Sequence, residues 1–182
     1  IVLVVGKGEE KFCRKEIVDK YGISKVKAIV EGGKERYHSV FEGLKQTSDA
    51  DYVLIHDGAR PFVNQDIIRR CMQEVQKYQA CVVGMPVKDT IKIADEEGYA
   101  KQTPDRKNVW MIQTPQTFSY ALIYEAYEEM LKTEDTAITD DAMVLERIKG
   151  KKSKLIEGSY RNIKITTPED LLIANVYLQH PE

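Results

Sequence analysis

Three side chains suited to chemistry on a bound ligand follow one apolar run of the sequence. Residues 52–55 (Tyr-Val-Leu-Ile) form a continuous apolar stretch, as expected for a strand covered on both faces of a parallel sheet. His56, Asp57 and Arg60 come directly after it, and Pro61 rules out a simple continuation as a central strand. Ligands of open α/β sheets bind beyond the carboxyl ends of the strands, so a carboxylate and a guanidinium here are well placed. The alternative is an Asp57–Arg60 ion pair that only closes the loop.

A glycine turn is the second candidate site. Gly32 and Gly33 separate a strand predicted at 26–30 from a predicted helix. Such a turn presents free backbone N–H groups and the positive end of the helix dipole, which suits anions. Arg36 and Ser39 lie three residues apart and share one helix face near that end. An ordinary strand–helix turn is the alternative, because a Gly-Gly pair alone is a weak signal.

Polar residues at two later positions are further candidates. Thr139 is expected to be the N-cap of a helix, with Asp140 and Asp141 in its favourable first turn. Capping alone would also explain these three residues. Lys164 lies on a short strand predicted at 162–166, where strand alternation places it on the face opposite its two isoleucine neighbours. A solvated lysine is the alternative there.

The order of the predicted elements indicates a doubly wound, mostly parallel α/β sheet. Strands are expected at 1–5, 26–30, 52–55 and 80–84, with helices at 9–21, 37–44 and 66–78, the last with Ile67, Cys71, Val75 and Tyr78 inward. Later in the chain, helices are expected at 119–131, from Thr139 to Gly150, and from Thr167-Pro168 onward, with short strands at 154–156 and 162–166. We expect residues 1–182 to form a single domain.

A β-hairpin arm interrupts this alternation. Residues 86–93 alternate with period two, as a half-exposed strand does, and Asp95-Glu-Glu-Gly98 is typical of a turn. The sequence therefore predicts a protruding hairpin at about 87–113. A hairpin of this kind is marginal alone in water, so we expect it to pack on a second copy of the chain.

Composition excludes several classes of protein. A net charge of −2 over 182 residues argues against general nucleic-acid binding, which needs a basic face. Three cysteines without metal-ligand spacing indicate reduced thiols, and hence a cytoplasmic protein. No apolar run is long enough to span a bilayer, and no signal peptide is visible. Because the sequence begins inside a predicted strand and without Met, we expect a further segment before it.

Six motifs in order carry a family resemblance. They are Glu31-Gly-Gly-Lys-Glu-Arg36-x-x-Ser39-Val40, His56-Asp57-Gly-Ala-Arg60-Pro61, Pro86-Val-Lys-Asp-Thr90, Asp105-Arg106…Trp110…Gln113-Thr114-Pro115-Gln116-x-Phe118, Ile138-Thr139-Asp140-Asp141-Ala142 and Asn162-Ile-Lys164-Ile-Thr166-x-Pro168-Glu-Asp170. Together they resemble the 2-C-methyl-D-erythritol 4-phosphate cytidylyltransferase family over nearly the whole chain. The ribitol-5-phosphate cytidylyltransferases are the nearest alternative, but the Asp-Arg-x-x-x-Trp stretch and the Thr-Asp-Asp-Ala motif favour the methylerythritol family.

The resemblance implies a Rossmann-like α/β fold and a homodimer joined by an exchanged β-arm. It also implies a Mg²⁺-dependent reaction in which CTP and the polyol phosphate yield the cytidine diphosphate product and pyrophosphate, in the non-mevalonate route to isoprenoids. Mg²⁺ is expected to arrive with CTP, and no residue is assigned as a metal ligand. In the dimer, each active site would combine Arg36 and Lys164 of one chain with Arg106 of the other.

The resemblance also assigns roles to individual residues. Those implied to bind the nucleotide are Gly32, Gly33, Arg36, Ser39, Asp57, Ala59 and Arg60. Those implied to bind the polyol phosphate are Thr90, Thr114, Thr139 and Asp140, and the implied catalytic residues are Arg106 and Lys164. The family's Gly-rich, basic loop and its early catalytic lysine do not occur in these 182 residues, so we expect this segment alone to lack turnover. A non-catalytic nucleotide-binding or dimerisation module, or a plain structural α/β domain, is the alternative from another class.

Overall fold

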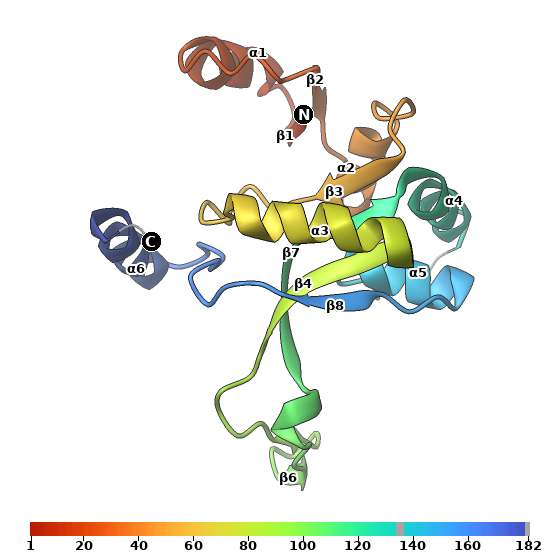
Figure 1. The fold of residues 1–182 in the computed structure, drawn as a ribbon, viewed down its shortest axis with the longest axis vertical. Coiled ribbons are helices and arrows are strands. Elements are labelled where there is room, and N and C mark those ends of the chain that lie inside the picture. Colours follow the sequence, from red (N-terminus) through yellow and green to blue (C-terminus); the bar gives the residue numbers. More distant parts are fainter. Residues whose placement is uncertain (134–136, 181–182) are drawn as a thin grey trace. The chain divides into compact units, whose positions relative to one another are not determined.

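The computed structural model describes residues 1–133 and 137–180. The sequence also predicts a polar loop at 133–137, most of which lies outside the described residues. The chain divides into two compact units, each built from two separate segments. The first unit comprises Ile1–Ile55 and Phe118–Lys152, and the second comprises His56–Thr117 and the residues from Ser153 on. Figure 1 shows the ribbon of both units, with the helices and strands labelled and coloured along the sequence.

The first unit contains the predicted glycine turn. Its elements are β1 (Val2–Val5), α1 (Glu10–Cys13), a π-helical turn η1 (Arg14–Asp19), β2 (Ala28–Glu31), α2 (Arg36–Leu44), β3 (Tyr52–Ile55), α4 (Tyr120–Met130) and α5 (Asp141–Lys149). Strands β1 and β2 pair in parallel, with Val5 opposite Glu31, so both end at the same edge. The single helix predicted at 9–21 is therefore wrong in detail, because the hydrogen bonding changes from α to π at Arg14.

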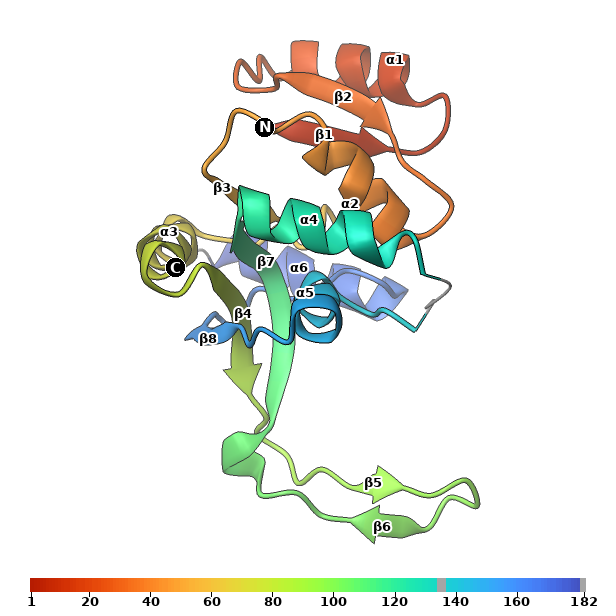
Figure 2. The ribbon, with the colours of Figure 1, turned by 90° about the vertical axis from the view of Figure 1, so that its right-hand side faces the viewer.

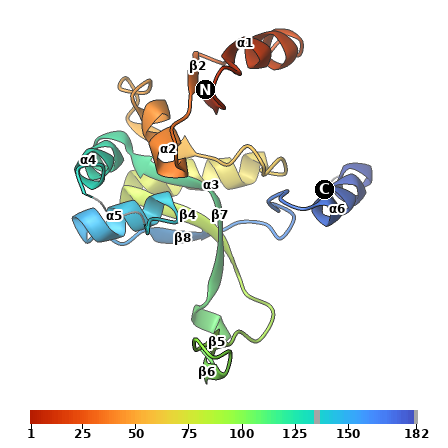
Figure 3. The same ribbon diagram turned by 180° about the vertical axis from the view of Figure 1, so that it is seen from behind.

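Helix α4 provides much of the core of the first unit. Ile123, Ala126, Tyr127 and Met130 are fully buried, and their spacing of three and one places them on one helix face. Figure 3 shows α4 and α5 side by side, and Val144 and Leu145 of α5 are fully buried as well. The sequence predicts an inner face of Leu122, Ile123, Ala126, Tyr127 and Met130 for this helix, and all but the half-buried Leu122 are confirmed as buried.

The second unit contains the helix α3 (Gln65–Tyr78), β4 (Ala80–Pro86) and β8 (Lys154–Glu157), with α6 (Pro168–Gln179) after them. Strands β4 and β8 are parallel. Ile67, Cys71 and Val75 of α3 are buried as predicted, but Tyr78 is 45% exposed. That prediction is wrong because α3 ends there: Gln79 takes the left-handed conformation (φ 61°), and the Tyr78 ring lies under the Lys154 ammonium instead.

The predicted hairpin arm is present in the second unit. Strands β5 (Ile93–Ala94) and β6 (Ala100–Gln102) are antiparallel, and Figure 2 shows them beyond the ends of β4 and β7 (Trp110–Ser119). Residues 87–92 form no strand, contrary to the alternation at 86–93, and all five residues of β5 and β6 are exposed. Alternation alone does not hold a strand there, because a strand forms only where a neighbouring strand pairs with it, and the described pairing of the arm is limited to β5 and β6.

Two further expectations concern the end of the chain. The strand predicted at 162–166 is wrong, since these residues are irregular, although Lys164 is exposed and its neighbours Ile163 and Ile165 are half-buried as alternation predicted. Thr167 is the N-cap of α6, with Pro168 at its first position, as predicted. Within residues 1–133 and 137–180, no helix is long and apolar enough to cross a membrane.

Candidate active site

The glycine turn lines a pocket of the first unit. The pocket has a volume of about 680 Å³ and is lined by Val4, Val5, Gly6, Lys7, Glu31, Gly32, Gly33, Lys34 and Ser39. The Gly33 N–H donates to Ser39 Oγ (3.1 Å), which ties the turn to the first turns of α2. A Cβ at Gly32 would lie 2.7 Å from Ser39 Oγ, and one at Gly33 would collide with the His38 side chain. Only glycine fits these two positions, so the backbone itself forms this wall of the pocket.

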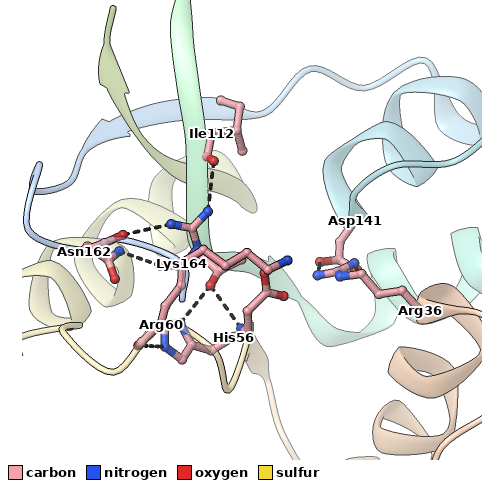
Figure 4. Close-up of polar contacts among 9 residues, drawn as sticks. Arg36, His56, Arg60, Ile112, Asp141, Asn162 and Lys164 are labelled. Atoms are coloured by element: carbon pink, nitrogen blue, oxygen red, sulfur yellow. Dashed lines mark hydrogen bonds and ion pairs between the residues drawn. The ribbon is translucent and has the colours of Figure 1, made fainter. Parts of the chain in front are cut away.

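Arg36 is held by a buried carboxylate rather than standing free. Its two terminal nitrogens donate to the two oxygens of Asp141, at 2.9 and 2.8 Å, and Asp141 is completely buried (Figure 4). The Tyr127 hydroxyl donates to the same carboxylate at 2.5 Å. Burial and the adjacent Asp141 raise the pKa of Tyr127 well above its ordinary value, so the phenol keeps its proton. These three side chains fix the start of α2 against α4 and α5 within the first unit.

The N-cap of α5 is Asp140 and not Thr139, which corrects the sequence prediction by one residue. Asp140 accepts a hydrogen bond from the Met143 N–H at 2.8 Å, while the Thr139 hydroxyl lies 3.8 Å from Met143 Sδ. An Asp N-cap is favoured over Thr because a carboxylate also interacts with the positive end of the helix. Asp141 is then in the first turn, where its side chain points inward to Arg36.

In the second unit, the loop after β3 meets the residues before α6. The Lys164 ammonium lies 2.9 Å from Asp57 Oδ2, in a pair whose side chains are 43% and 17% exposed. The backbone joins the same segments, because the Ile165 N–H donates to the Ala59 carbonyl at 2.8 Å. The structure therefore brings together Asp57, Ala59 and Lys164, which the sequence assigned separately.

Arg60 is bound to backbone carbonyls. Its guanidinium donates to Asn162 O at 2.8 Å and to Ile112 O at 3.4 Å (Figure 4). Burial lowers the pKa of Arg60, and the Asp57 carboxylate nearby opposes that shift. Arg60 thus holds the loop to β7 and to the Asn162 segment, which is closer to the structural role left open for it.

Thr114 of β7 is buried and forms hydrogen bonds both to the loop after β3 and to Asn162. Its hydroxyl accepts the Asp57 N–H at 3.0 Å and lies 3.0 Å from His56 Nδ1. Its carbonyl accepts from Asn162 Nδ2 at 2.9 Å. The predicted contact of Thr114 with substrate stays a prediction, while its hydroxyl has a visible role in holding the loop.

Arg106 and Thr90 belong to the base of the arm. Arg106 is exposed and donates to the Lys88 carbonyl at 3.1 Å, and Thr90 is exposed and irregular. The Lys88 ammonium lies 3.6 Å from the centre of the Tyr160 ring, whose hydroxyl donates to Pro86 O. The arm therefore presents a guanidinium to solvent from an anchored base.

Metal ligation by protein groups finds no support in the part of the chain that the structure describes. No three His, Cys, Asp or Glu side chains there lie together in a way that could hold a metal ion. Asp57 faces Lys164, an arrangement suited to charge balance. Mg²⁺ commonly keeps several waters and binds through substrate phosphates, and the expectation that it arrives with CTP stays a prediction.

Sequence reasoning missed three residues of these networks. His56 was noted beside Asp57 but received no role, and Asp141 was interpreted as a helix-capping acid. Tyr127 was assigned to the core alone. A charged residue on an apolar helix face was the available signal for Asp141, since an acid there needs a buried partner.

In this structure, parallel strands end in polar loops, and a glycine turn leads from one strand into a helix. These features are typical of α/β proteins that bind phosphorylated ligands beyond the ends of their strands. Within that class, the family model of IspD, 2-C-methyl-D-erythritol 4-phosphate cytidylyltransferase, matches residues 1–180. The chain belongs to this family and is a cytidylyltransferase.

Individual relatives agree with the family model. The 2-C-methyl-D-erythritol 4-phosphate cytidylyltransferase of Alkaliphilus oremlandii is 53% identical over 180 residues, which cover 98% of this chain and 75% of that protein. The crystal structure of 4-diphosphocytidyl-2C-methyl-D-erythritol synthase from Anaerococcus prevotii matches with a TM-score of 0.89 at 39% identity, covering 99% of this chain and 78% of that one. The Thermus thermophilus cytidylyltransferase structure gives a TM-score of 0.77 at 31% identity, covering 98% and 81%. The predicted fold class is confirmed.

Proposed function

We propose that the enzyme transfers the cytidylyl group of CTP to 2-C-methyl-D-erythritol 4-phosphate, a step of isoprenoid precursor biosynthesis. The observation that carries this proposal is the family match over residues 1–180, which includes all six sequence motifs. A phosphate oxygen of the substrate attacks the α-phosphorus of CTP, the new P–O bond forms, and the bond to the β-phosphate breaks. Pyrophosphate leaves with that electron pair.

The reaction brings two polyanions together, so the protein's task is positioning and charge neutralisation. A phosphate is already a competent nucleophile, and no serine or cysteine is needed. Lys164 supplies a compact positive charge, which Asp57 holds at 2.9 Å. Arg106 supplies a planar guanidinium group that can bind a phosphate with two hydrogen bonds. The remaining assigned residues keep the nucleotide-binding and substrate-binding roles that the resemblance implies.

Mg²⁺ belongs to the proposal as an ion that arrives with CTP and neutralises its phosphates. No step is assigned to it through a protein ligand. A cytoplasmic location stays a prediction, supported by three cysteines that are free and buried.

A homodimer joined by the arm is also part of the proposal. Ile93 and Tyr99 on the arm are large apolar side chains that are 46% and 70% exposed. A second chain that buried these side chains would stabilise the hairpin, which is marginal by itself. The arm would then deliver Arg106 to the partner's active site.

Turnover with defined substrates tests the function directly. The full-length enzyme with CTP, Mg²⁺ and 2-C-methyl-D-erythritol 4-phosphate should release pyrophosphate and form the cytidine diphosphate product, measured by a coupled assay and mass spectrometry. Ribitol 5-phosphate is the matched control and should react far more slowly. Equal or faster turnover of ribitol 5-phosphate would assign the protein to the other substrate class.

Base selection tests the glycine turn. If Gly33 and its neighbours hydrogen-bond the cytosine edge, kcat/KM should be far higher for CTP than for UTP. A site built for one pattern of donors and acceptors leaves buried polar groups unpaired with the other, which can give a ratio of about 10⁴. Steady-state kinetics with both nucleotides measure this ratio. Comparable values would remove the turn from base recognition.

A further inference from the structure

We propose that His56 is a positioning residue, whose imidazole fixes the loop that holds Asp57 in front of Lys164. The proposal rests on the function given above, because it concerns the same active site. Figure 4 shows His56 beneath Lys164 and beside Arg60, at the start of the loop. Nothing in the chemistry of the transfer requires an imidazole, so its two hydrogen bonds need another explanation.

The imidazole joins both ends of the loop. Its Nε2 lies 3.0 Å from the Arg60 carbonyl oxygen, and its Nδ1 lies 3.0 Å from Thr114 Oγ1. A carbonyl oxygen can only accept, so Nε2 carries the hydrogen and donates. In the neutral ring Nδ1 then accepts, and the Thr114 hydroxyl is the donor. One tautomer therefore satisfies both contacts.

The same hydroxyl determines the position of Asp57. The Asp57 N–H donates to Thr114 Oγ1 at 3.0 Å, and Thr114 is only 4% exposed. The Thr114 hydroxyl has a single hydrogen. When it donates that hydrogen in a hydrogen bond to His56 Nδ1, a lone pair of the oxygen is directed toward the Asp57 N–H. The backbone of Asp57 is thereby fixed to β7, and its carboxylate reaches Lys164 at 2.9 Å.

Arg60 holds a different part of the loop. Its guanidinium donates to Asn162 O and Ile112 O, which secures the far end of the loop to neighbouring segments. Replacing His56 should therefore release Asp57 while Arg60 stays bound.

The expected effect is on catalysis. In His56→Phe, kcat/KM for CTP should fall about 10- to 100-fold, since a displacement of about 1 Å in an active site costs about 10²-fold. His56→Asn keeps a side-chain oxygen that can accept the Thr114 hydroxyl, and it should recover part of the loss. Thr114→Val, which removes the hydroxyl that accepts the Asp57 N–H, should resemble His56→Phe. His180→Phe, at the exposed end of α6, is the matched histidine control.

A double-mutant cycle with Asp57→Asn gives the decisive readout. If His56 acts through Asp57, His56→Phe should cost little more once Asp57 has been replaced, and the two effects should not add. Additive losses, or a thermal midpoint that falls in proportion to activity, would make His56 a structural residue and overturn the proposal. Unchanged kinetics in His56→Phe would overturn it as well. Wild-type enzyme that turns over CTP with ribitol 5-phosphate at least as fast as with 2-C-methyl-D-erythritol 4-phosphate would refute the substrate assignment while leaving this test intact.

Discussion

Refolded mixtures of Lys164→Ala and Arg106→Ala chains should regain about a quarter of wild-type activity, although each variant alone is nearly inactive. Removing one well-aimed electrostatic group costs about 10²–10³ in rate. In the proposed dimer, each site takes Lys164 from one chain and Arg106 from its partner. A mixed dimer then has one site with both defects and one intact site. Random pairing of equal amounts makes half of the dimers mixed, so a quarter of all sites are complete.

The two variants are unfolded and refolded together, dimers are confirmed by size, and pyrophosphate release is measured. Each variant refolded alone is the control. Lys164 suits this experiment better than Arg36, because Lys164 is 43% exposed whereas Arg36 neutralises a buried carboxylate. Activity that stays at the level of the single variants, although mixed dimers have formed, would place Arg106 in its own chain's site.

Replacing Arg36 by Met should lower the free energy of unfolding by about 3–5 kcal/mol, because it leaves the Asp141 carboxylate buried without its cation. The guanidinium donates to both Asp141 oxygens, and only the Tyr127 hydroxyl would remain among the three side chains. Urea unfolding, followed by circular dichroism, measures the change.

Lys45→Met, at the C-cap of the same helix, is the matched control. Lys45 pairs with Glu42 at 2.7 Å, but both side chains are about 40% exposed, and such surface pairs contribute about 0–1 kcal/mol. The double variant Arg36→Met with Asp141→Leu should regain much of the stability, since no uncompensated charge remains. A loss in Arg36→Met no larger than that in Lys45→Met would show that Asp141 is not dependent on its ion pair.

The sequence correctly predicts those helices and strands whose apolar residues recur with the spacing of a buried face. The strand at 52–55 has the predicted bounds, and the face of α4 that carries Ile123 and Tyr127 is buried as its spacing required. The loop after β3 was recognised as a site because polar residues follow an apolar strand abruptly. In each case the signal lies within a few neighbouring residues.

Long-range partners explain what the sequence did not predict. Asp141 pairs with Arg36, 105 positions away, and no local pattern records that distance. Asp57 was weighed against Arg60, three residues on, but its ion pair is with Lys164. Long-range contacts also explain why residues 162–166 form no strand. The carbonyl and the side-chain amide of Asn162 bind Arg60 and Thr114, and not a neighbouring strand.

The interleaved composition of the two units has a consequence for how the protein is made. Ile1–Ile55 is synthesised before Phe118–Lys152, which completes its unit, and the other unit needs the residues from Ser153 on. The first hydrophobic core can therefore close only after Lys152 has been synthesised, and the second only after the residues that follow it. Until then the apolar strands at 2–5 and 80–86 have no completed core to cover them, which makes the nascent chain a natural client of chaperones.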